Sequence, residues 1–322
     1  MGRIAFLTGA TGFVGGHLAR HLADAGWTVR ALARKTSDTA RLRELGATLI
    51  PGGLDDADAL AAGADGAEVV FHLAGATTAP DEEAFRRVNA GGTRNVVRAI
   101  LGAAARPRRL VYMSSYAAVG PAPDGRPRRM DDPPAPLTAY GRTKLEGERE
   151  AEAVKEGGVE LLVLRSPAVY GPGDHAFLPL FRMARRSLAP VPAGGERTVH
   201  MVYVDDLARA LARAADAPQG AYAVAEPVAH TQSGIAAAIG AALGTRPVRV
   251  PVPAALFRLA GAVAERVGGA GVFSREKADE ILARAWVCDL AGSQALLPAA
   301  EATPLAAGAA ETARWYRTQG WL

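Results

Sequence analysis

Short apolar runs alternate with helical patterns through the first half of the chain. The runs that precede turn or helix signals are Arg3–Leu7, Thr28–Leu32, Thr48–Pro51, Glu68–Leu73, Arg109–Met113 and Glu160–Leu164. Strands that are apolar almost throughout are buried on both faces, as in a parallel sheet covered by helices. After the first run, Val14, Leu18 and Leu22 recur at helical spacing. The pattern therefore predicts an α/β fold with a doubly wound parallel sheet.

The alternating pattern ends near Tyr170. Proline- and glycine-rich segments follow, and helical patterns return at Val204–Asp216, Ser233–Leu243, Ala254–Val267 and Glu301–Trp321. We expect one domain over residues 1–170, with its last strands contributed from about 196–230, and a smaller helix-rich lobe over most of 171–322. That lobe should cover the carboxyl edge of the sheet, where open α/β sheets bind ligands.

The longest apolar stretch, Ala254 to Phe273, contains Arg258, Glu265 and Arg266. These charges leave it too broken to span a bilayer. We interpret it as an amphipathic helix packed on the protein, and we expect no membrane partner.

Composition narrows the classes of function further. The 322 residues have a formal net charge of +4 without a basic block, so nucleic-acid binding has little support, and Arg109 is expected at a solvated edge. The single cysteine, Cys288, excludes a disulfide within the chain. His17 and His21 lie four residues apart without further ligands, so no metal site is expected. With no secretory signal recognisable, we expect a cytoplasmic protein.

A glycine-rich turn follows the first predicted strand and reads Thr8-Gly9-Ala10-Thr11-Gly12-Phe13-Val14-Gly15. Gly9 permits a tight turn, Gly12 lets the backbone approach a phosphate, and Gly15 lets the helix pack on its strand. The helix then points unpaired N–H groups at an anion. An ordinary strand–helix turn is the alternative. The context favours a dinucleotide site formed by Gly9, Thr11, Gly12, Phe13 and Val14.

Further motifs follow along the chain in a fixed order. They are His72-Leu73-Ala74-Gly75, Asn89-Ala90-Gly91-Gly92-Thr93, Ser114-Ser115, Tyr140-Gly141-Arg142-Thr143-Lys144 and Pro167-Ala168-Val169-Tyr170-Gly171-Pro172. With this ordered set, residues 8–172 resemble the extended short-chain dehydrogenases/reductases of the NAD-dependent epimerase/dehydratase family. The resemblance implies a Rossmann-type sheet, a nicotinamide cofactor and a C-terminal substrate lobe. Many relatives dimerise through two helices beside the active site, so we expect a homodimer.

Three residues have the chemistry of carbonyl reduction: Ser115, Tyr140 and Lys144. Hydride transfer to a carbonyl leaves an alkoxide, and Tyr140 can supply its proton. Lys144 lies one helical turn further on, and its charge should lower the pKa of Tyr140. In the family, the carbonyl-orienting hydroxyl stands five residues before a glycine, which selects Ser115 before Gly120 and leaves Ser114 to backbone capping. The alternative is a capped strand end beside a surface tyrosine–lysine pair.

The resemblance also assigns residues around the cofactor and substrate. Tyr140 and Lys144 should contact the cofactor, Lys144 through the nicotinamide ribose. The adenine ribose and phosphates should be lined by Leu73, Ala74 and Gly75, and the nicotinamide by Pro167 and Val169. Asn89 should lie beside the active site, with a helix N-cap as its competing role. The substrate region is expected at Thr77, Tyr116, His175 and Tyr203. A structural role is the alternative, because a lone histidine or tyrosine in such a region is as often structural as substrate-binding.

Two departures from the family pattern bear on cofactor choice. NAD-specific members usually carry an acid after the second strand, whereas this chain has Arg34 and Lys35. A guanidinium can pair with a 2′-phosphate, although a solvated loop charge is the alternative. Gly52-Gly53-Leu54 also lacks the usual aspartate, which leaves Leu54 to cover the adenine. We predict NADP(H) as the preferred cofactor and NAD(H) as the second choice.

One further position bears on the substrate. Relatives that act on nucleotide sugars usually place an arginine seven residues before an Asp-Leu-Ala motif, but here Val199 precedes Asp206 by seven residues, with Arg197 two positions away. We therefore predict an oxidoreductase acting on a carbonyl or secondary alcohol of a small organic substrate. The alternatives are a nucleotide-sugar epimerase or dehydratase, and a non-enzymatic nucleotide-binding protein that would need no proton relay.

Overall fold

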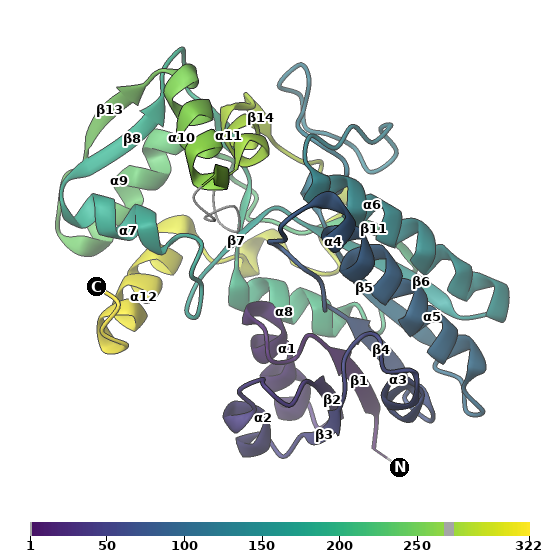
Figure 1. The fold of residues 1–322 in the computed structure, drawn as a ribbon. Coiled ribbons are helices and arrows are strands. Elements are labelled where there is room, and N and C mark those ends of the chain that lie inside the picture. Colours follow the sequence, from purple (N-terminus) through teal and green to yellow (C-terminus); the bar gives the residue numbers. More distant parts are fainter. Residues whose placement is uncertain (1, 267–273) are drawn as a thin grey trace.

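Seven parallel strands form the central sheet of the computed structural model, which describes residues 2–266 and 274–322 (Figure 1). Their order is β11-β6-β5-β4-β1-β2-β3, so the chain starts in the middle and winds outward in both directions. The bounds are β1 Ile4–Thr8, β2 Thr28–Ala33, β3 Thr48–Pro51, β4 Val69–His72, β5 Arg109–Ser115, β6 Glu160–Ser166 and β11 Gly220–Ala223. The first six match the predicted runs closely, and the expected Rossmann-type doubly wound sheet is confirmed.

Helices cover both faces of the sheet because successive residues of each strand point to opposite sides. Leu7 of β1 packs on one side with Leu18, whereas Phe6 packs on the other with Ile100. Burying each such side chain stabilises the fold by about 1.5–3 kcal/mol. One face carries α1 Phe13–Asp24, α2 Ala40–Glu44 and α8 Val204–Arg213, and the other carries α3 Ala57–Ala64, α5 Gly92–Gly102 and α6 Ala139–Glu152.

The remaining elements build a smaller lobe over the carboxyl ends of the strands (Figure 1). Phe181, Ile239 and Tyr316 contribute to its separate hydrophobic core. Its helices are α7 Leu178–Arg185, α9 Gln232–Leu243, α10 Ala254–Arg266, α11 Arg275–Leu282 and α12 Leu305–Thr318. Its short strands pair as β7 Ala168–Tyr170 with β10 Met201–Tyr203, β8 Leu188–Pro192 with β13 Val248–Val252, and β9 Thr198–Val199 with both β12 His230–Thr231 and β14 Ala285–Trp286.

Two predicted helices are shorter in the structure. The last helix begins at Leu305 rather than Glu301 because Pro304 occupies its N-cap, and it ends before Gly320, whose φ is +69°. Likewise, α8 ends at Arg213 instead of Asp216. The predicted end of the apolar stretch, from Val267 to Phe273, lies outside the described residues.

The helix α10 forms and packs on the protein through α11, as expected, but three of its large apolar side chains remain exposed instead of being buried. Only Gly261 of this helix is buried, and a Cβ there would lie 2.6 Å from the carbonyl oxygen of Ser274. This close approach seats the small-residue side of α10 against α11 and leaves Leu256, Leu259 and Val263 outside. No helix within the described residues is long and apolar enough to cross a membrane.

Arg109 also departs from the expected solvated edge, because it is only 4% exposed. Its guanidinium donates to the carbonyl oxygens of Ala214 and Ala217, at 2.6 and 2.5 Å, and forms an ion pair with Glu160. These contacts tie β5 to the end of α8. The charge is buried because three oxygens replace the water that it loses.

Candidate active site

The turn between β1 and α1 has the geometry that the glycine motif predicts. Gly9 adopts a φ of +77°, and a Cβ there would lie 2.6 Å from the backbone nitrogen of Ala74. A Cβ on Gly15 would overlap the carbonyl of Gly9. The N-cap of α1 is Gly12, and no side chain caps this end, so the first N–H groups of the helix are available to an anion. These free backbone N–H groups fit the pyrophosphate of a dinucleotide. Thr11 is exposed at the same turn.

The neighbouring strand ends bring the other predicted cofactor residues to the same edge of the sheet. Arg34 and Lys35 follow β2 directly and are exposed, and no ion pair engages them within the described residues. Leu54 follows β3, which pairs with β2, and its side chain lies against Gly92 of α5. Pro167 links β6 to β7, in which Val169 pairs with Val202.

Asn89 connects the segment after β4 with the helix that carries the predicted catalytic residues. Its side-chain oxygen accepts from the backbone nitrogen of Ala76 at 2.8 Å, and its amide donates to the hydroxyl of Thr143 at 3.1 Å. Asn89 lies inside a π-helical turn, residues Arg87–Gly91, between α4 (Glu82–Arg86) and α5. The competing N-cap role is therefore wrong, because the cap of α4 is Asp81.

Sequence reasoning missed His72, which is completely buried at the end of β4. Its Nδ1 lies 2.7 Å from the Thr8 hydroxyl and its Nε2 lies 3.0 Å from the Thr93 hydroxyl. Because Thr93 donates its own hydrogen to the carbonyl of Asn89, Nε2 must donate and Nδ1 must accept. Burial, assisted by the charge of Lys144, lowers the pKa of His72 to about 3. The neutral ring of His72 thus connects the end of β1, just before the predicted phosphate-binding turn, to Asn89 through Thr93. In the sequence, its only signal was that it is a polar residue at the end of an otherwise apolar strand.

The three predicted catalytic residues come together between β5 and α6. Ser115 ends β5, and its hydroxyl oxygen accepts from the backbone nitrogen of Ala117 at 3.2 Å. The same hydroxyl lies close enough to Tyr140 to influence the pKa of the phenol. Tyr140 lies in the first turn of α6, and Lys144 follows one turn later. The ammonium of Lys144 donates to the carbonyl of Met113 at 2.7 Å, which anchors it at the end of β5. A Cβ on Gly75 would lie 3.8 Å from this ammonium.

The pKa of Tyr140 does not follow the simple expectation. Burial raises the pKa, while the charge of Lys144 and the neighbouring hydroxyl of Ser115 lower it by less, so the net direction is upward. Burial likewise lowers the pKa of Lys144 against the attraction of Tyr140 and Glu148. The expected lowering by Lys144 is present, but desolvation outweighs it, so in the protein alone Tyr140 is a protonated acid at neutral pH.

Ser114 is not a backbone cap, in contrast to the expectation. Its hydroxyl donates to the carboxylate of Glu148 at 2.5 Å, and Arg165 pairs with the same carboxylate at 2.7 Å. Glu148 lies on α6 one turn beyond Lys144, and both members of the ion pair are nearly buried. The pair therefore fixes α6 against β5 and β6 beside the three predicted catalytic residues.

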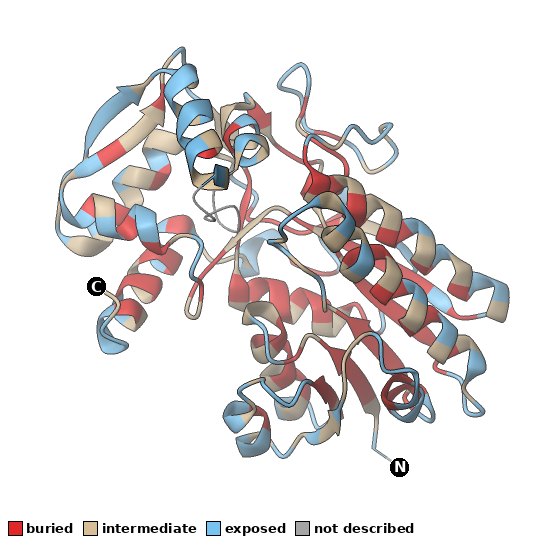
Figure 2. Cartoon of the chain, in the orientation of Figure 1, coloured by how far each residue is buried: buried red, intermediate tan, exposed pale blue. Residues whose placement is uncertain are grey.

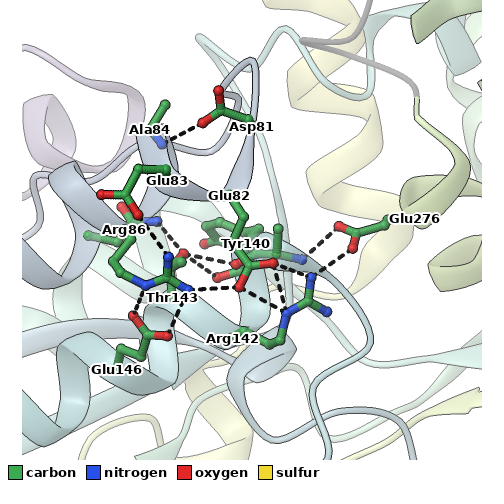
Figure 3. A network of polar contacts seen from close by, with 12 residues as sticks. Asp81, Glu82, Glu83, Ala84, Arg86, Tyr140, Arg142, Thr143, Glu146 and Glu276 are labelled. Carbon is green, nitrogen blue, oxygen red and sulfur yellow. Dashed lines mark hydrogen bonds and ion pairs between the residues drawn. The ribbon is translucent and has the colours of Figure 1, made fainter.

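A network of ion pairs connects α4, α6 and α11 around Tyr140 (Figure 3). Glu276 of α11 accepts from the backbone nitrogen of Ala139 at 2.6 Å and pairs with Arg142 at 2.9 Å. Arg142 in turn pairs with Glu82 at 2.7 Å. The smaller lobe is thereby bonded directly to the residue before Tyr140, a contact between segments that no local sequence signal indicates.

The four expected substrate residues have different surroundings. Thr77 is exposed in the segment after β4. The hydroxyl of Tyr116 donates to the carbonyls of Arg128 and Val287, at 2.8 and 3.2 Å, which gives it a structural role. His175 stacks on Trp321 with ring centroids 4.2 Å apart. The remaining residue, Tyr203, lines a cavity of about 490 Å³ that also borders α1 and α12.

His17 and His21 both face Asp205, which also pairs with Arg20, and this cluster joins α1 to α8. These contacts strongly lower the pKa of Asp205, the two histidines acting most. Within residues 2–266 and 274–322, no group of three or more histidine, cysteine or acidic side chains is arranged to hold a metal ion.

Comparison with known proteins identifies the family. A model of the NAD dependent epimerase/dehydratase family matches residues 5–225, more than half of the chain. The chain belongs to this family. It is of the extended short-chain dehydrogenase/reductase type, as the ordered motifs indicate, and such enzymes are NAD(P)-dependent.

The chain also matches individual members of the epimerase/dehydratase family. It is 34% identical over 331 residues to a ceramide reductase of Caulobacter vibrioides, covering 99% of this chain and 96% of the relative. It is 34% identical over 180 residues to a 4-hydroxy-2-methyl-3-oxo-4-farnesyl-3,4-dihydroquinoline-1-oxide ketoreductase of Stigmatella aurantiaca, covering 54% and 52% of the two chains. The structure of MoeE5 in complex with UDP-glucose and NAD has a TM-score of 0.72, 25% identity and 99% coverage of both chains. These relatives indicate an enzyme rather than a nucleotide-binding protein without activity.

Proposed function

We propose that this enzyme is an NADP(H)-dependent oxidoreductase that interconverts a ketone and a secondary alcohol on a small apolar organic molecule. The observation that carries the proposal is the assembly of Ser115, Tyr140 and Lys144 where β5 ends and α6 begins. A hydroxyl, a phenol and an ammonium so arranged can orient a carbonyl and move one proton. The ceramide reductase and ketoreductase among the relatives support reduction of an apolar substrate.

Each residue of the assembly has a separate task in this chemistry. When bound, the nicotinamide cofactor would supply the hydride for the carbonyl carbon. Tyr140 donates its phenolic proton to the carbonyl oxygen, so the substrate gains one hydride and one proton and becomes an alcohol. Ser115 still has its hydroxyl hydrogen to donate, because its oxygen accepts from Ala117, and that hydrogen orients the carbonyl. Lys144 stabilises the tyrosinate that remains.

The surroundings of Arg197 favour this reaction over the nucleotide-sugar alternative. Its guanidinium donates to the backbone carbonyls of Leu282, Pro192, Gly195 and Ala193. A group already bonded to four carbonyls offers little to a diphosphate. Val199, at the position where relatives carry the clamp, lies in β9 between β12 and β14 and has no charge to offer.

A substrate panel tests the reductase proposal. With NADPH in excess, kcat/KM for water-soluble methyl ketones should rise about fourfold for each added methylene that the site buries, since each contributes ~0.8 kcal/mol. UDP-glucose should show no micromolar binding by calorimetry, and the Arg197→Ala variant should match the wild type in this assay. Micromolar binding of UDP-glucose that Arg197→Ala weakens would restore the epimerase alternative and contradict the proposal.

The cofactor preference is tested by substitution after β2. Arg34→Ala should raise the Kd for NADPH by about 10- to 100-fold, because a charge-assisted hydrogen bond is worth ~1.5–3 kcal/mol, and should leave the Kd for NADH unchanged. Fluorescence titration of both cofactors measures this. The matched control is Arg43→Ala, which removes an exposed arginine of α2 and should bind NADPH like the wild type. Tighter binding of NADH than of NADPH by the wild type would be evidence against Arg34 as a 2′-phosphate ligand.

A further inference from the structure

An apolar side of α10 lies uncovered on the smaller lobe. Leu256, Leu259 and Val263 are 53%, 59% and 51% exposed, and their spacing places them on one side of the helix. The opposite side packs on α11 at Gly261. Single exposed apolar residues are common on protein surfaces, but three large ones at this spacing form a continuous apolar stripe along the helix.

Further exposed apolar side chains lie on the two paired strands β8 and β13, the second of which directly precedes α10 in the chain. Leu188 of β8 pairs with Val248 of β13, and Val250 lies two residues further along on the same side. Of the nine large apolar side chains most exposed on the described chain, six lie in β8, β13 and α10. We call these six the docking face: Leu188, Val248, Val250, Leu256, Leu259 and Val263. Figure 2 shows β13 and the visible side of α10 largely exposed.

Arginines border the docking face where the two strands begin. Arg185 and Arg186 are exposed just before β8, and Arg246 is exposed just before β13. Hydrogen bonds between residues 184–187 and 245–248 hold these two segments side by side. Within the described residues, no ion pair joins these three arginines to an acid. The border of the face therefore carries uncompensated positive charge.

The acids near the docking face do not offset this charge, because each one already faces an arginine. The pairs are Arg249–Glu196, Arg258–Asp279 and Arg275–Glu265. A second copy of the chain, docked through the same face about a two-fold axis, would present the same basic border. A surface of anionic phosphates instead complements the arginines while its apolar layer accepts the leucine and valine side chains.

We propose that the docking face binds the surface of an anionic phospholipid bilayer, with α10 lying in the interface and not crossing it. This replaces the sequence-based expectation that the protein has no membrane partner. The inference deepens the proposed function and rests on it in part, because an apolar ketone concentrates in a bilayer. The docking face is also connected structurally to the active site, because α10 packs on α11 and Glu276 of α11 is bonded to the residue before Tyr140.

Vesicle co-sedimentation of the full chain tests the proposal. The protein should sediment with vesicles of equal parts phosphatidylglycerol and phosphatidylcholine. Replacing Leu256, Leu259 and Val263 together by serine should lower the partition coefficient at least about tenfold, since interfacial binding scales with buried apolar area. Replacing Arg185, Arg186 and Arg246 by glutamine should weaken binding to these vesicles but not to pure phosphatidylcholine. As matched control, V228S removes a 57% exposed valine outside the docking face and should bind like the wild type.

Several results would overturn the proposal. One is failure of the wild type to sediment with the anionic vesicles, and another is equally good sedimentation of the triple serine variant. A third contradicting result is a wild-type dimer in light scattering that is lost in the serine variant, with no vesicle binding by either protein. Reduction of a short, water-soluble ketone should be unchanged in the serine variant, because these side chains lie outside the active site. If no ketone is reduced but vesicle binding depends on the docking face, the proposed function fails and the membrane inference stands.

Discussion

Replacing Tyr140 by phenylalanine should lower kcat for ketone reduction by about 10²- to 10⁴-fold, the usual contribution of a general acid. The phenol is the group of the assembly expected to give the proton to the carbonyl oxygen, since the Ser115 hydroxyl is far too weak an acid and the Lys144 ammonium is directed to the carbonyl of Met113. Stopped-flow measurement of NADPH consumption, with cofactor Kd measured separately, isolates the chemical step.

The matched control for this experiment is Tyr222→Phe. The hydroxyl of Tyr222 donates to the carbonyl of Pro218 at the protein surface, away from the active site, so this variant should retain the wild-type kcat. Thermal unfolding of both variants shows whether either substitution alters the fold. A Tyr140→Phe protein that reduces the ketone at a near-normal rate would remove the tyrosine from the mechanism.

Substituting Lys144 by methionine should reduce kcat by about 10²-fold or more, because the charge of Lys144 stabilises the tyrosinate form of Tyr140. It should also weaken cofactor binding, because the family resemblance implies a bond from the ammonium to the nicotinamide ribose. It should also change the pH dependence. The positive charge of Lys144 lowers the pKa of Tyr140, so its loss raises that pKa further. Alcohol oxidation needs tyrosinate and should therefore begin to rise only at higher pH, whereas ketone reduction needs the phenol and should stay level through neutral pH.

Rate profiles of both directions against pH, for the wild type and Lys144→Met, measure this displacement. Lys144→Arg serves as the control because it keeps the charge, and its oxidation profile should stay nearer to that of the wild type. An oxidation profile that is identical in the wild type and Lys144→Met would show that the lysine does not act on the tyrosine pKa.

The strands could be predicted from the sequence because a sheet buried on both faces demands nearly continuous apolar residues. The placement of Ser115, Tyr140 and Lys144 at one sheet edge followed from the ends of those strands and the helical spacing of two residues. Local pattern and tertiary packing agree at these positions, so short windows of sequence were sufficient.

The errors arose where distant segments meet. Arg109 is buried because α8 supplies carbonyl groups, and Ser114 turns to Glu148 because α6 brings a carboxylate beside it. The face that α10 buries is decided by one glycine that allows close contact with α11. Each of these partners comes from an element distant in the sequence. The periodicity of apolar residues, which reports only on near neighbours, therefore could not predict these contacts.

The bond between Glu276 and the start of α6 limits how freely this enzyme can be recombined. A designer who exchanges the smaller lobe for that of a relative, in order to change the substrate, also exchanges the group that holds Ala139 and Arg142 in place. The lobe is thus not an independent module, because part of the scaffold of the catalytic tyrosine is encoded more than a hundred residues away. A chimera needs a carboxylate at position 276, whatever substrate pocket it acquires.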